Sequence, residues 1–486
     1  MAYFKENDQH HVNLSTGEIR DFRSHKLKAL FLPVDIASVV YFRIIFGLIM
    51  LWEVSRYFSK DWIARYWIKP AFHFTYWPFD FLQPLPGIGM YIIFGVLALL
   101  SLFIVAGFLF RASVILFFFG FTYTFLLEQT RYLNHFYLVV LISFILIFIP
   151  ASKAGSLDAL IFPRHRSQVV PAWCLWILRF TIGLPYFFGG IAKINSDWLA
   201  GEPMRSWLLR RTDFPLIGQY FTEEWMVYSI AYGGLLLDIL IVPLLLIKRT
   251  RKFAFLAALL FHLMNARLFT IGIFPWFMIA ATAIYFDPSW PRKFLSKLRI
   301  FSADKQQHFQ PALSVKQSST QVRNLITAAL ISWCSLHIIL PFRHLLISGN
   351  VHWTEEGHKY SWHMKLRSKN AKGIFIVKDK ATGKRMRIKP RAYLTSWQER
   401  KMLEWPNLIW QFCQMVKQDH KRNGMDVAVY ANISASLNGR PHQLLINPSV
   451  DIAAQPRPVV GHAPWIFPLQ TPLEVGNPDA VDEVVE

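Results

Sequence analysis

One basic side chain stands near the end of a long apolar run that begins at about residue 172. At helical spacing Tyr186, Gly189, Gly190 and Lys193 fall on one face, so the two glycines leave room beside the amine for a ligand or another helix. A cationic side chain at mid-bilayer costs about 3 kcal/mol unless it reaches the interface, pairs or loses its proton. Two interpretations of Lys193 stay open: a side chain that extends to the membrane surface, or a buried neutral amine that acts as a general base.

Other polar groups also interrupt apolar runs. Asn134-His135 opens one run, where the amide can cap a helix and the imidazole can hydrogen-bond at the interface, or both can take part in chemistry. His262 and Asn265 share a helix face, which suits hydrogen bonding between helices and contact with a ligand equally well. Asp238 lies near the middle of its run, so it needs a partner or a proton.

The composition indicates a multi-pass membrane protein. Of the 486 residues, 53% are hydrophobic and 16% aromatic, and the apolar residues come in long blocks. The formal charge of +21 is spread over the loops between those blocks, as topology signals and contacts with acidic lipid headgroups require, so we expect a lipid bilayer as partner and no nucleic acid. Cys174, Cys334 and Cys413 are far apart, so neither a disulfide framework nor a metal site is expected.

The apolar windows predict about nine spans within a transmembrane domain of residues 35–347. Clusters of basic residues precede the first window (37–57) and follow the fourth (136–150) and the sixth (225–247), so we expect these three connecting segments in the cytoplasm. The N-terminal segment 1–34 and the basic stretch from Arg292 to Arg323 are expected there too. Lys193 and His135 then lie near the opposite face of the membrane. The windows fall near 37–57, 89–110, 112–128, 136–150, 172–194, 225–247, 252–268, 270–286 and 323–346.

After residue 348 the pattern becomes that of a water-exposed α+β domain, residues 348–455, on the far side of the membrane. Alternation predicts strands through 360–366, 373–377, 386–388 and 427–437, and a helix is predicted from after Trp405 to Lys421. Asn438-Gly439 predicts a hairpin with a return strand at 443–446. From Asp451 onward, including a tail of 456–486, we expect loose order. The predicted fold is a polytopic α-helical membrane bundle with a C-terminal α+β domain.

These features support two classes of function equally well. One is a membrane enzyme with a buried base, and the other is a transporter whose histidine, lysine and aspartate side chains relay protons. The two halves of the chain share no repeated hydropathy pattern, and a large far-side domain after the last span is unusual in transporters. Both observations weigh against the transporter.

The chain resembles the vitamin K-dependent gamma-glutamyl carboxylase family, whose membrane part occurs in bacteria as the horizontally transferred transmembrane (HTTM) domain. The resemblance covers roughly residues 35–455, including the far-side domain, and several separate motifs carry it. These are Gln83-Pro84-Leu85-Pro86, Asn134-His135-x-Tyr137-Leu138, Gly190 to Trp198, Gly233 to Asp238, Phe261 to Gly272, Trp290-Pro291-Arg292-Lys293, Tyr360-Ser361-Trp362, Ser436 to Arg440, and Asn447 to Ile452.

The resemblance implies an enzyme that oxygenates reduced vitamin K to its epoxide and uses the strong base so formed to carboxylate peptidyl glutamate. The co-substrates implied are reduced vitamin K, O2 and CO2, with no metal, and the partner is a glutamate-containing protein or peptide. By motif, Lys193 is the base that takes the hydroquinone proton, and His135 supports carboxylation. The residues implied to bind substrate or quinone are Asn134, Tyr186, His262, Asn265, Tyr360 and Trp362.

The chain also departs from the animal enzymes. Cys413 matches one cysteine of a family disulfide, but the loop 58–88 has no cysteine to pair with it. The chain stops soon after Ile452, which argues against propeptide recognition of the animal type. Gly357-His358-Lys359 precedes Tyr360, and this difference leaves open a quinone epoxidase that does not carboxylate protein. A bacterial inner membrane is the expected location in preference to the endoplasmic reticulum.

Overall fold

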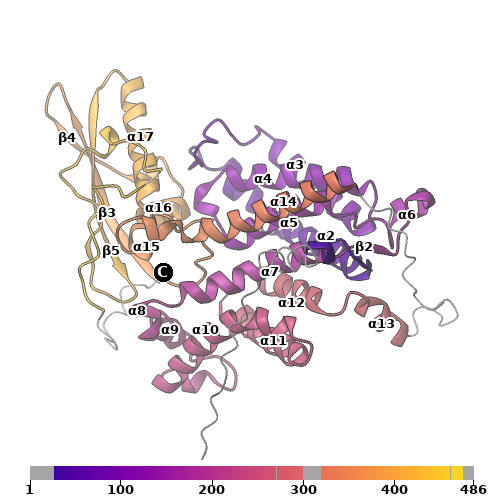
Figure 1. Cartoon of the computed structure of the whole chain (residues 1–486). Helices are drawn as coiled ribbons and strands as arrows, with labels where there is room; N and C mark the ends of the chain where they lie inside the picture. Colours follow the sequence, from indigo (N-terminus) through magenta and orange to yellow (C-terminus); the bar gives the residue numbers. More distant parts are fainter. Residues whose placement is uncertain (1–26, 270, 299–318, 460, 474–486) are drawn as a thin grey trace, which may run out of the picture.

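The computed structural model describes residues 27–269, 271–298, 319–459 and 461–473. A bundle of helices occupies one side of the molecule, and a sheet with two helices lies against one end of the bundle (Figure 1). The predicted N-terminal segment up to residue 26, most of the basic stretch before Arg323 and the end of the chain from residue 474 lie outside the described residues.

Each of the nine apolar windows contains a helix, because uninterrupted apolar sequence satisfies its backbone hydrogen bonds most readily that way. Among the described residues, five helical segments are long and apolar enough to cross a membrane: Ala37–Ser59, Gly89–Ala106, Trp173–Ala192, Glu224–Leu246 and Thr320–Leu346. The count of nine spans stays a prediction. The helices of the bundle are α2 (Ala37–Ser59), α3 (Gly89–Ala106), α4 (Phe110–Leu126), α5 (Asn134–Phe148), α7 (Trp173–Ala192), α10 (Glu224–Leu246), α11 (Arg251–Leu268), α12 (Phe274–Thr282) and α14 (Thr320–Ile339).

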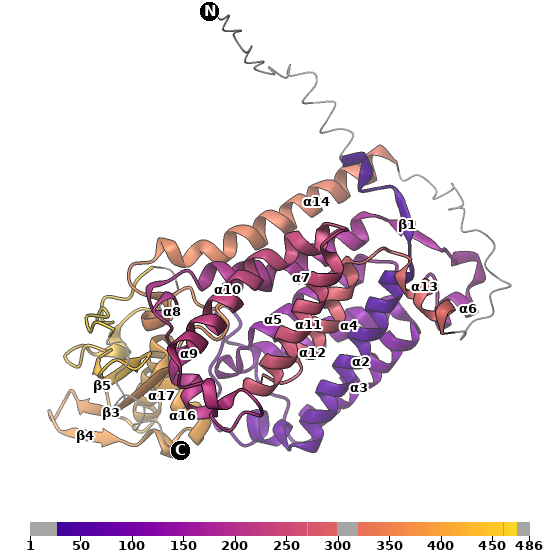
Figure 2. The same ribbon diagram turned by 90° about the horizontal axis from the view of Figure 1, so that it is seen from below.

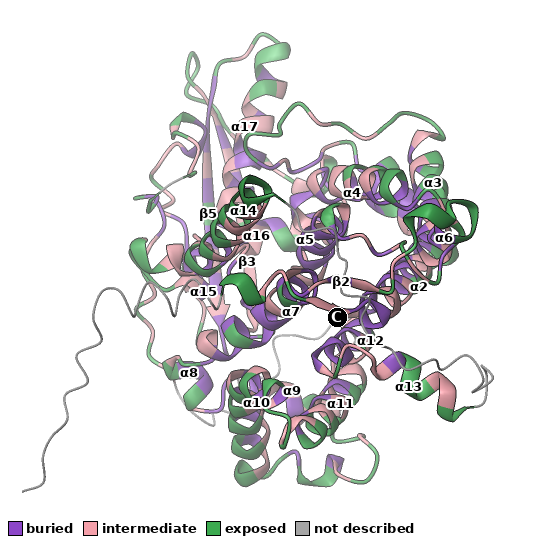
Figure 3. Ribbon diagram, turned by 45° about the vertical axis from the view of Figure 1, so that its right-hand side comes forward, coloured by how far each residue is buried: buried purple, intermediate pink, exposed green. Residues whose placement is uncertain are grey.

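Short elements connect these helices. A two-stranded antiparallel sheet joins the segments that precede α2 and α7, with Val34 opposite Val170 (Figure 2). The outward faces of α10, α11 and α14 are largely exposed and apolar, as helices in contact with lipid require (Figure 3). The connecting elements are β1 (Pro33–Asp35), α6 (Leu157–Ile161), β2 (Val169–Pro171), α8 (Ser196–Leu199), α9 (Met204–Leu208) and α13 (Trp290–Lys297).

The C-terminal region, residues 348–473, holds a four-stranded antiparallel sheet in the order β4-β3-β5-β6. The predicted strands at 373–377, 386–388 and 427–437 are confirmed, as are the helix after Trp405 and the return strand, although α16 was not predicted. Asn438 and Gly439 both have positive φ, as the Asn-Gly hairpin signal implies. The elements are α15 (Val351–Thr354), β3 (Lys369–Asp379), β4 (Arg385–Ile388), α16 (Ser396–Glu404), α17 (Pro406–Arg422), β5 (Val427–Leu437) and β6 (Gln443–Leu444).

Two predictions for this region are wrong. The alternation through 360–366 does not form a strand, because Tyr360, Trp362 and Lys365 adopt left-handed backbone conformations that break the extended chain. The segment after Asp451 is not loose in its described part: Trp465 and Ile466 are buried, and Ile466 pairs with Ile446 next to the sheet. Buried apolar side chains therefore hold a proline-rich segment whose composition suggested disorder.

Candidate active site

Lys193 is the first residue beyond α7, and its amine points into the protein. Nζ donates hydrogen bonds to Asp238 Oδ2 at 2.5 Å and to the Gly189 carbonyl at 3.2 Å. Lys193 is 7% exposed and Asp238, on α10, is 5% exposed. The interpretation in which the side chain extends to the membrane surface is therefore wrong, and the amine forms a buried ion pair between two helices.

Gly189 and Gly190, on the same face of α7 as Lys193, allow α7 to approach α10 closely. A Cβ on Gly190 would lie 2.7 Å from Ile239 Cγ1 and 3.0 Å from the Ile239 backbone nitrogen, so only glycine lets α7 and α10 come this close. A Cβ on Gly189 would lie 3.4 Å from Asp238 Oδ2. The sequence predicted that these glycines leave room for a ligand or for another helix. In the structure the space beside Gly190 is filled by α10.

A cavity of about 450 Å³ lies beside the Lys193–Asp238 pair. Apolar side chains of α7, α10, α11 and α12 form most of its wall, and the polar groups are few. Four of the predicted site residues line it together: Lys193, Tyr186, His262 and Asn265. An apolar cavity of this size with a few converging polar groups is typical of a small-molecule site.

Tyr186 joins two helices across the cavity wall. Its hydroxyl lies 2.7 Å from His262 Nε2 and 3.0 Å from Thr282 Oγ1, and all three side chains are buried. Because Nε2 is occupied by Tyr186, the second ring nitrogen of His262 is the one left open: Nδ1 has no hydrogen-bond partner among the described residues. The site thus presents one imidazole nitrogen and one amine in an apolar surrounding.

Asn134 and His135 do not line this cavity. The His135 ring stacks on Phe274 with centroids 5.8 Å apart, and Phe274, which lines the cavity, also contacts the His262 ring at 6.2 Å. The Phe274 ring thus lies between His135 and the cavity that Lys193 lines. Asn134 does not cap α5, since Leu133 holds that position; its Nδ2 donates to the His363 carbonyl at 3.0 Å.

Tyr360 and Trp362 pack against the bundle beside the cavity without lining it. The Tyr137 ring lies 4.9 Å from Tyr360 and 5.1 Å from Trp362, and the Tyr360 backbone N–H donates to the Tyr132 hydroxyl at 2.6 Å. The residues that follow do reach the cavity: Met364 and Lys365 form part of its wall. The C-terminal region therefore closes one side of a cavity made by helices of the bundle.

A second ion pair fixes the C-terminal region next to Lys193. Asp197 on α8 accepts two hydrogen bonds of 2.7 Å from the Arg440 guanidinium and one of 2.8 Å from Asn438. Burial raises the pKa of the Asp197 carboxyl, but the bonds from Arg440 and Asn438 outweigh it and hold the pKa below its usual value. The hairpin at Asn438 is thereby attached four residues beyond Lys193, at the start of α8.

Sequence reasoning did not pair these residues. Asp238 was recognised as an acid in need of a partner, but its partner comes from a different apolar run. The motifs that carry the family resemblance include Asp197, Asn438 and Arg440. Membership of these motifs is the only sequence signal that marks the three residues as functional candidates. Nothing in the local pattern around Met364 and Lys365 indicates a cavity wall.

Two family models match the chain. The HTTM domain matches residues 31–290, and the lumenal domain of vitamin K-dependent gamma-carboxylase matches residues 322–472. No solved structure gives a significant match. The HTTM domain and the five apolar helices identify an integral membrane protein. With the two matches covering the bundle and the C-terminal region in the order expected, the chain belongs to the vitamin K-dependent gamma-carboxylase family.

Proposed function

We propose that this protein oxygenates reduced vitamin K to its epoxide and couples that reaction to the carboxylation of glutamate in a protein or peptide. The observation that carries the proposal is the buried Lys193–Asp238 pair on the wall of an apolar cavity, inside the matched HTTM domain. We further propose that the N-terminus lies in the cytoplasm and the C-terminal region on the periplasmic or lumenal side of the membrane, with a bacterial inner membrane as the location.

The residues of the cavity suit a reduced quinone. A volume of about 450 Å³ lies within the range of small-molecule sites, and the apolar wall suits the ring and the isoprenoid chain. Lys193, His262 Nδ1 and Asn265 offer polar atoms for the two hydroxyl groups. When bound, reduced vitamin K supplies through its oxygenation the strong base that removes the γ-proton of glutamate.

The pairing of Lys193 with Asp238 gives the amine a route to its neutral form. At 2.5 Å the ammonium proton needs to move only a short way to reach the carboxylate. Neutralisation removes two buried charges from an apolar surrounding, which offsets part of the cost of the proton transfer, so the neutral pair is accessible from the ion pair. With the proton on Asp238, the Nζ lone pair first faces the Asp238 hydroxyl. When Nζ turns from this hydroxyl toward the cavity, it can accept a phenolic proton.

The remaining groups orient the ligand and exclude water. The Tyr186 and Thr282 hydroxyls fix the His262 ring, so that Nδ1 is held in one direction. Met364 and Lys365 cover the cavity from the C-terminal region. A closed site favours the proposed reaction, because water would protonate the glutamate carbanion before CO2 could reach it.

Epoxidation without carboxylation is the second candidate function. His135, which the resemblance assigns to carboxylation, lies behind Phe274 and does not line the cavity that contains Lys193. A chain that had lost carboxylation could retain the amine and the quinone cavity while His135 serves only to pack. An assay of both half-reactions distinguishes the two candidates.

The test measures epoxide formation and labelled CO2 incorporation in the same membranes, with reduced vitamin K, O2, bicarbonate and a glutamate peptide. Lys193→Ala should lower epoxide formation by about 10²- to 10⁴-fold, the usual contribution of a general base. Lys69→Ala, at an exposed lysine, should leave the rate unchanged. Epoxide formation by Lys193→Ala at the wild-type rate would remove the amine from the mechanism.

His135→Ala separates the half-reactions. We expect it to lose CO2 incorporation while it keeps part of the epoxidation, because Phe274 shields the Lys193 cavity from the change. Equal loss of both activities would mean that His135 shapes the shared cavity. Epoxide formation with no CO2 incorporation by the wild-type protein would favour the epoxidase.

A further inference from the structure

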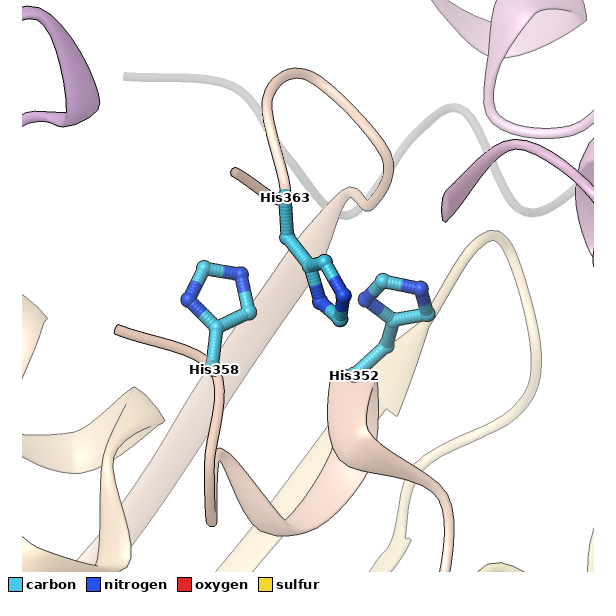
Figure 4. A group of neighbouring side chains, drawn as sticks. All are labelled: His352, His358 and His363. Atoms are coloured by element: carbon cyan, nitrogen blue, oxygen red, sulfur yellow. The ribbon is translucent and has the colours of Figure 1, made fainter. Parts of the chain in front are cut away.

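Three histidines meet inside the C-terminal region, away from the cavity that contains Lys193. His352 lies on α15, and His358 and His363 lie on the irregular chain that follows it (Figure 4). All three are buried, with ring centroids 5.2 Å apart for two of the pairs and 6.3 Å for the third. One nitrogen from each ring can be chosen so that the three lie within 4.8 Å of one another.

The hydrogen bonding of this cluster is incomplete. The Nδ1 atom of each of the three rings has no hydrogen-bond partner among the described residues, although each side chain is more than nine-tenths buried. Buried polar atoms are almost always hydrogen-bonded, because an unpaired one loses its bonds to water and gains nothing in return. The Nδ1 atoms of His352 and His363 can each offer a lone pair, and they indicate that a ligand completes the cluster.

The nitrogen of His358 that can bind a metal ion is Nε2. An Arg367 N–H lies 2.6 Å from Nε2, and a guanidinium can only donate, so Nε2 carries the lone pair and Nδ1 the hydrogen. The nearest carboxylate oxygen, from Glu355, lies 3.9 Å from Nδ1, too far for a hydrogen bond. A metal ion would therefore bind Nε2 in the place that the Arg367 N–H now holds.

We propose that His352, His358 and His363 bind a divalent transition-metal ion of the zinc class. Neutral imidazole nitrogens are the ligands that Zn²⁺ shares with neighbouring first-row metals, and three histidines leave a fourth position open. Zinc–nitrogen bonds of about 2.0–2.1 Å place the three nitrogens roughly 3.4 Å apart, so the rings close by about 1 Å on binding. His358 and His363 stand outside helix and strand, where this adjustment is small.

Arg367 competes with the metal ion for His358. Its guanidinium also binds the Glu355 carboxylate, with Nη2–Oε2 and Nε–Oε1 distances of 2.7 Å, and Lys369 Nζ lies 3.7 Å from the same carboxylate. On metal binding the guanidinium keeps Glu355 and leaves Nε2. A variant with a shorter cationic side chain at position 367 should therefore bind the metal ion more tightly. That side chain would keep the ion pair with Glu355 without reaching the His358 imidazole.

The position of the cluster gives the metal a structural role. His363 accepts a hydrogen bond from Asn134 of α5 through its carbonyl, and its neighbour Met364 lines the cavity beside Lys193. A metal ion at the three histidines would join α15 to the irregular segment that covers this cavity. Metal binding should therefore raise the thermal stability of the C-terminal region, in addition to any effect on turnover.

The test uses the full-length protein purified in detergent, stripped with a chelator and dialysed against Zn²⁺. We expect one bound zinc per chain by elemental analysis, and the visible absorption of tetrahedral Co²⁺ when cobalt replaces zinc. The double variant His352→Ala/His363→Ala should bind at least tenfold less metal. His420→Ala, at a buried histidine whose Nδ1 bonds the Val416 carbonyl, should bind as the wild type does.

Arg367→Lys should bind zinc several-fold more tightly than the wild type. Two outcomes would overturn the proposal: wild-type protein that holds no more metal than the double variant, or equal loss of metal in His420→Ala. X-ray absorption of the wild-type cobalt or zinc form needs no variant, and fewer than two imidazole ligands in its spectrum would also overturn it. These readouts do not depend on quinone turnover, so they stand apart from the proposed function.

Discussion

Lys193 and Asp197 are four residues apart in the sequence, and each forms a buried ion pair with a residue far along the chain. The pairs differ in what surrounds them. Lys193 has one carboxylate oxygen and one carbonyl as partners and lies on a cavity wall. Both oxygens of Asp197 accept hydrogen bonds from Arg440, one of them also from Asn438, and Asp197 does not line that cavity. The first pair can exchange protons with a ligand, and the second can only hold two parts of the protein together.

Asp238→Asn should have the largest effect, because it leaves the Lys193 ammonium buried without a counter-charge. Breaking a buried ion pair from one side costs about 3–5 kcal/mol of stability. We expect epoxide formation to fall with it, since the proposed proton acceptor for Lys193 is lost. Thermal unfolding of the purified protein and the epoxidation assay measure the two effects.

The matched control is Asp213→Asn, at an exposed acid 3.9 Å from Arg211. It should change neither stability nor activity, because exposed pairs contribute little. If Asp238→Asn behaved like this control, the short Lys193–Asp238 contact would have no energetic role, and the contrast between the two pairs would disappear.

Arg440→Gln should weaken attachment of the C-terminal region by about 2–3 kcal/mol, because the Asp197 carboxylate keeps only its bonds from Asn438 and from the neighbouring Ser196 hydroxyl. Hydrogen exchange at residues 436–446 should accelerate, while the amine of Lys193 keeps its partner. Epoxidation should therefore fall less than in Asp238→Asn.

The control is Arg385→Gln, at an exposed position on β4, which should leave exchange in this hairpin unchanged. Loss of epoxidation equal to that of Asp238→Asn would contradict a purely structural role for the second pair.

Gly190→Ala should cost about 1–3 kcal/mol, the usual range for overpacking, because the new methyl group meets Ile239 and pushes α7 from α10. The amine–carboxylate distance should lengthen, so we expect reduced epoxidation as well as a lower unfolding temperature. Gly95→Ala on α3 is the control, since its Cβ would meet nothing within 4 Å and Gly95 does not line the cavity. Equal unfolding temperatures for the two variants would show that the close helix contact is not needed.

The smallest effect is a pH dependence confined to the Asp197 pair. The pKa of Asp197 is lower in the folded protein than its usual value, so its stabilising contribution is fully present above about pH 4 and is lost as the pH falls further. The exchange rate in the hairpin, divided by the intrinsic rate of an unprotected amide at each pH, should be constant from neutral to mildly acidic pH and then rise. Asp197→Asn should remove this rise, and a rise that persists in the variant would assign it to another group.

The sequence alone determined the membrane helices and most of the sheet. Apolar runs near the length of a bilayer form helices wherever they occur, and the alternation at 427–437 with Asn438-Gly439 specifies a strand and its turn locally. It also indicated that Lys193 and Asp238 each needed an explanation, because a charge in an apolar run is costly whatever surrounds it. The motifs identified the family before any contact was known.

Only the tertiary structure decided which charges meet. That Lys193 pairs with Asp238 depends on the Gly190 contact between two helices, and that Met364 covers the cavity depends on left-handed residues that no alternation pattern reveals. The same holds for the three histidines, whose spacing in the sequence matches no metal motif and whose nitrogens converge only after α15 packs. Such contacts join residues far apart in the sequence, and the local sequence around one residue does not depend on that around its partner. The contacts stabilise the protein only once the chain has folded, so no local pattern predicts them.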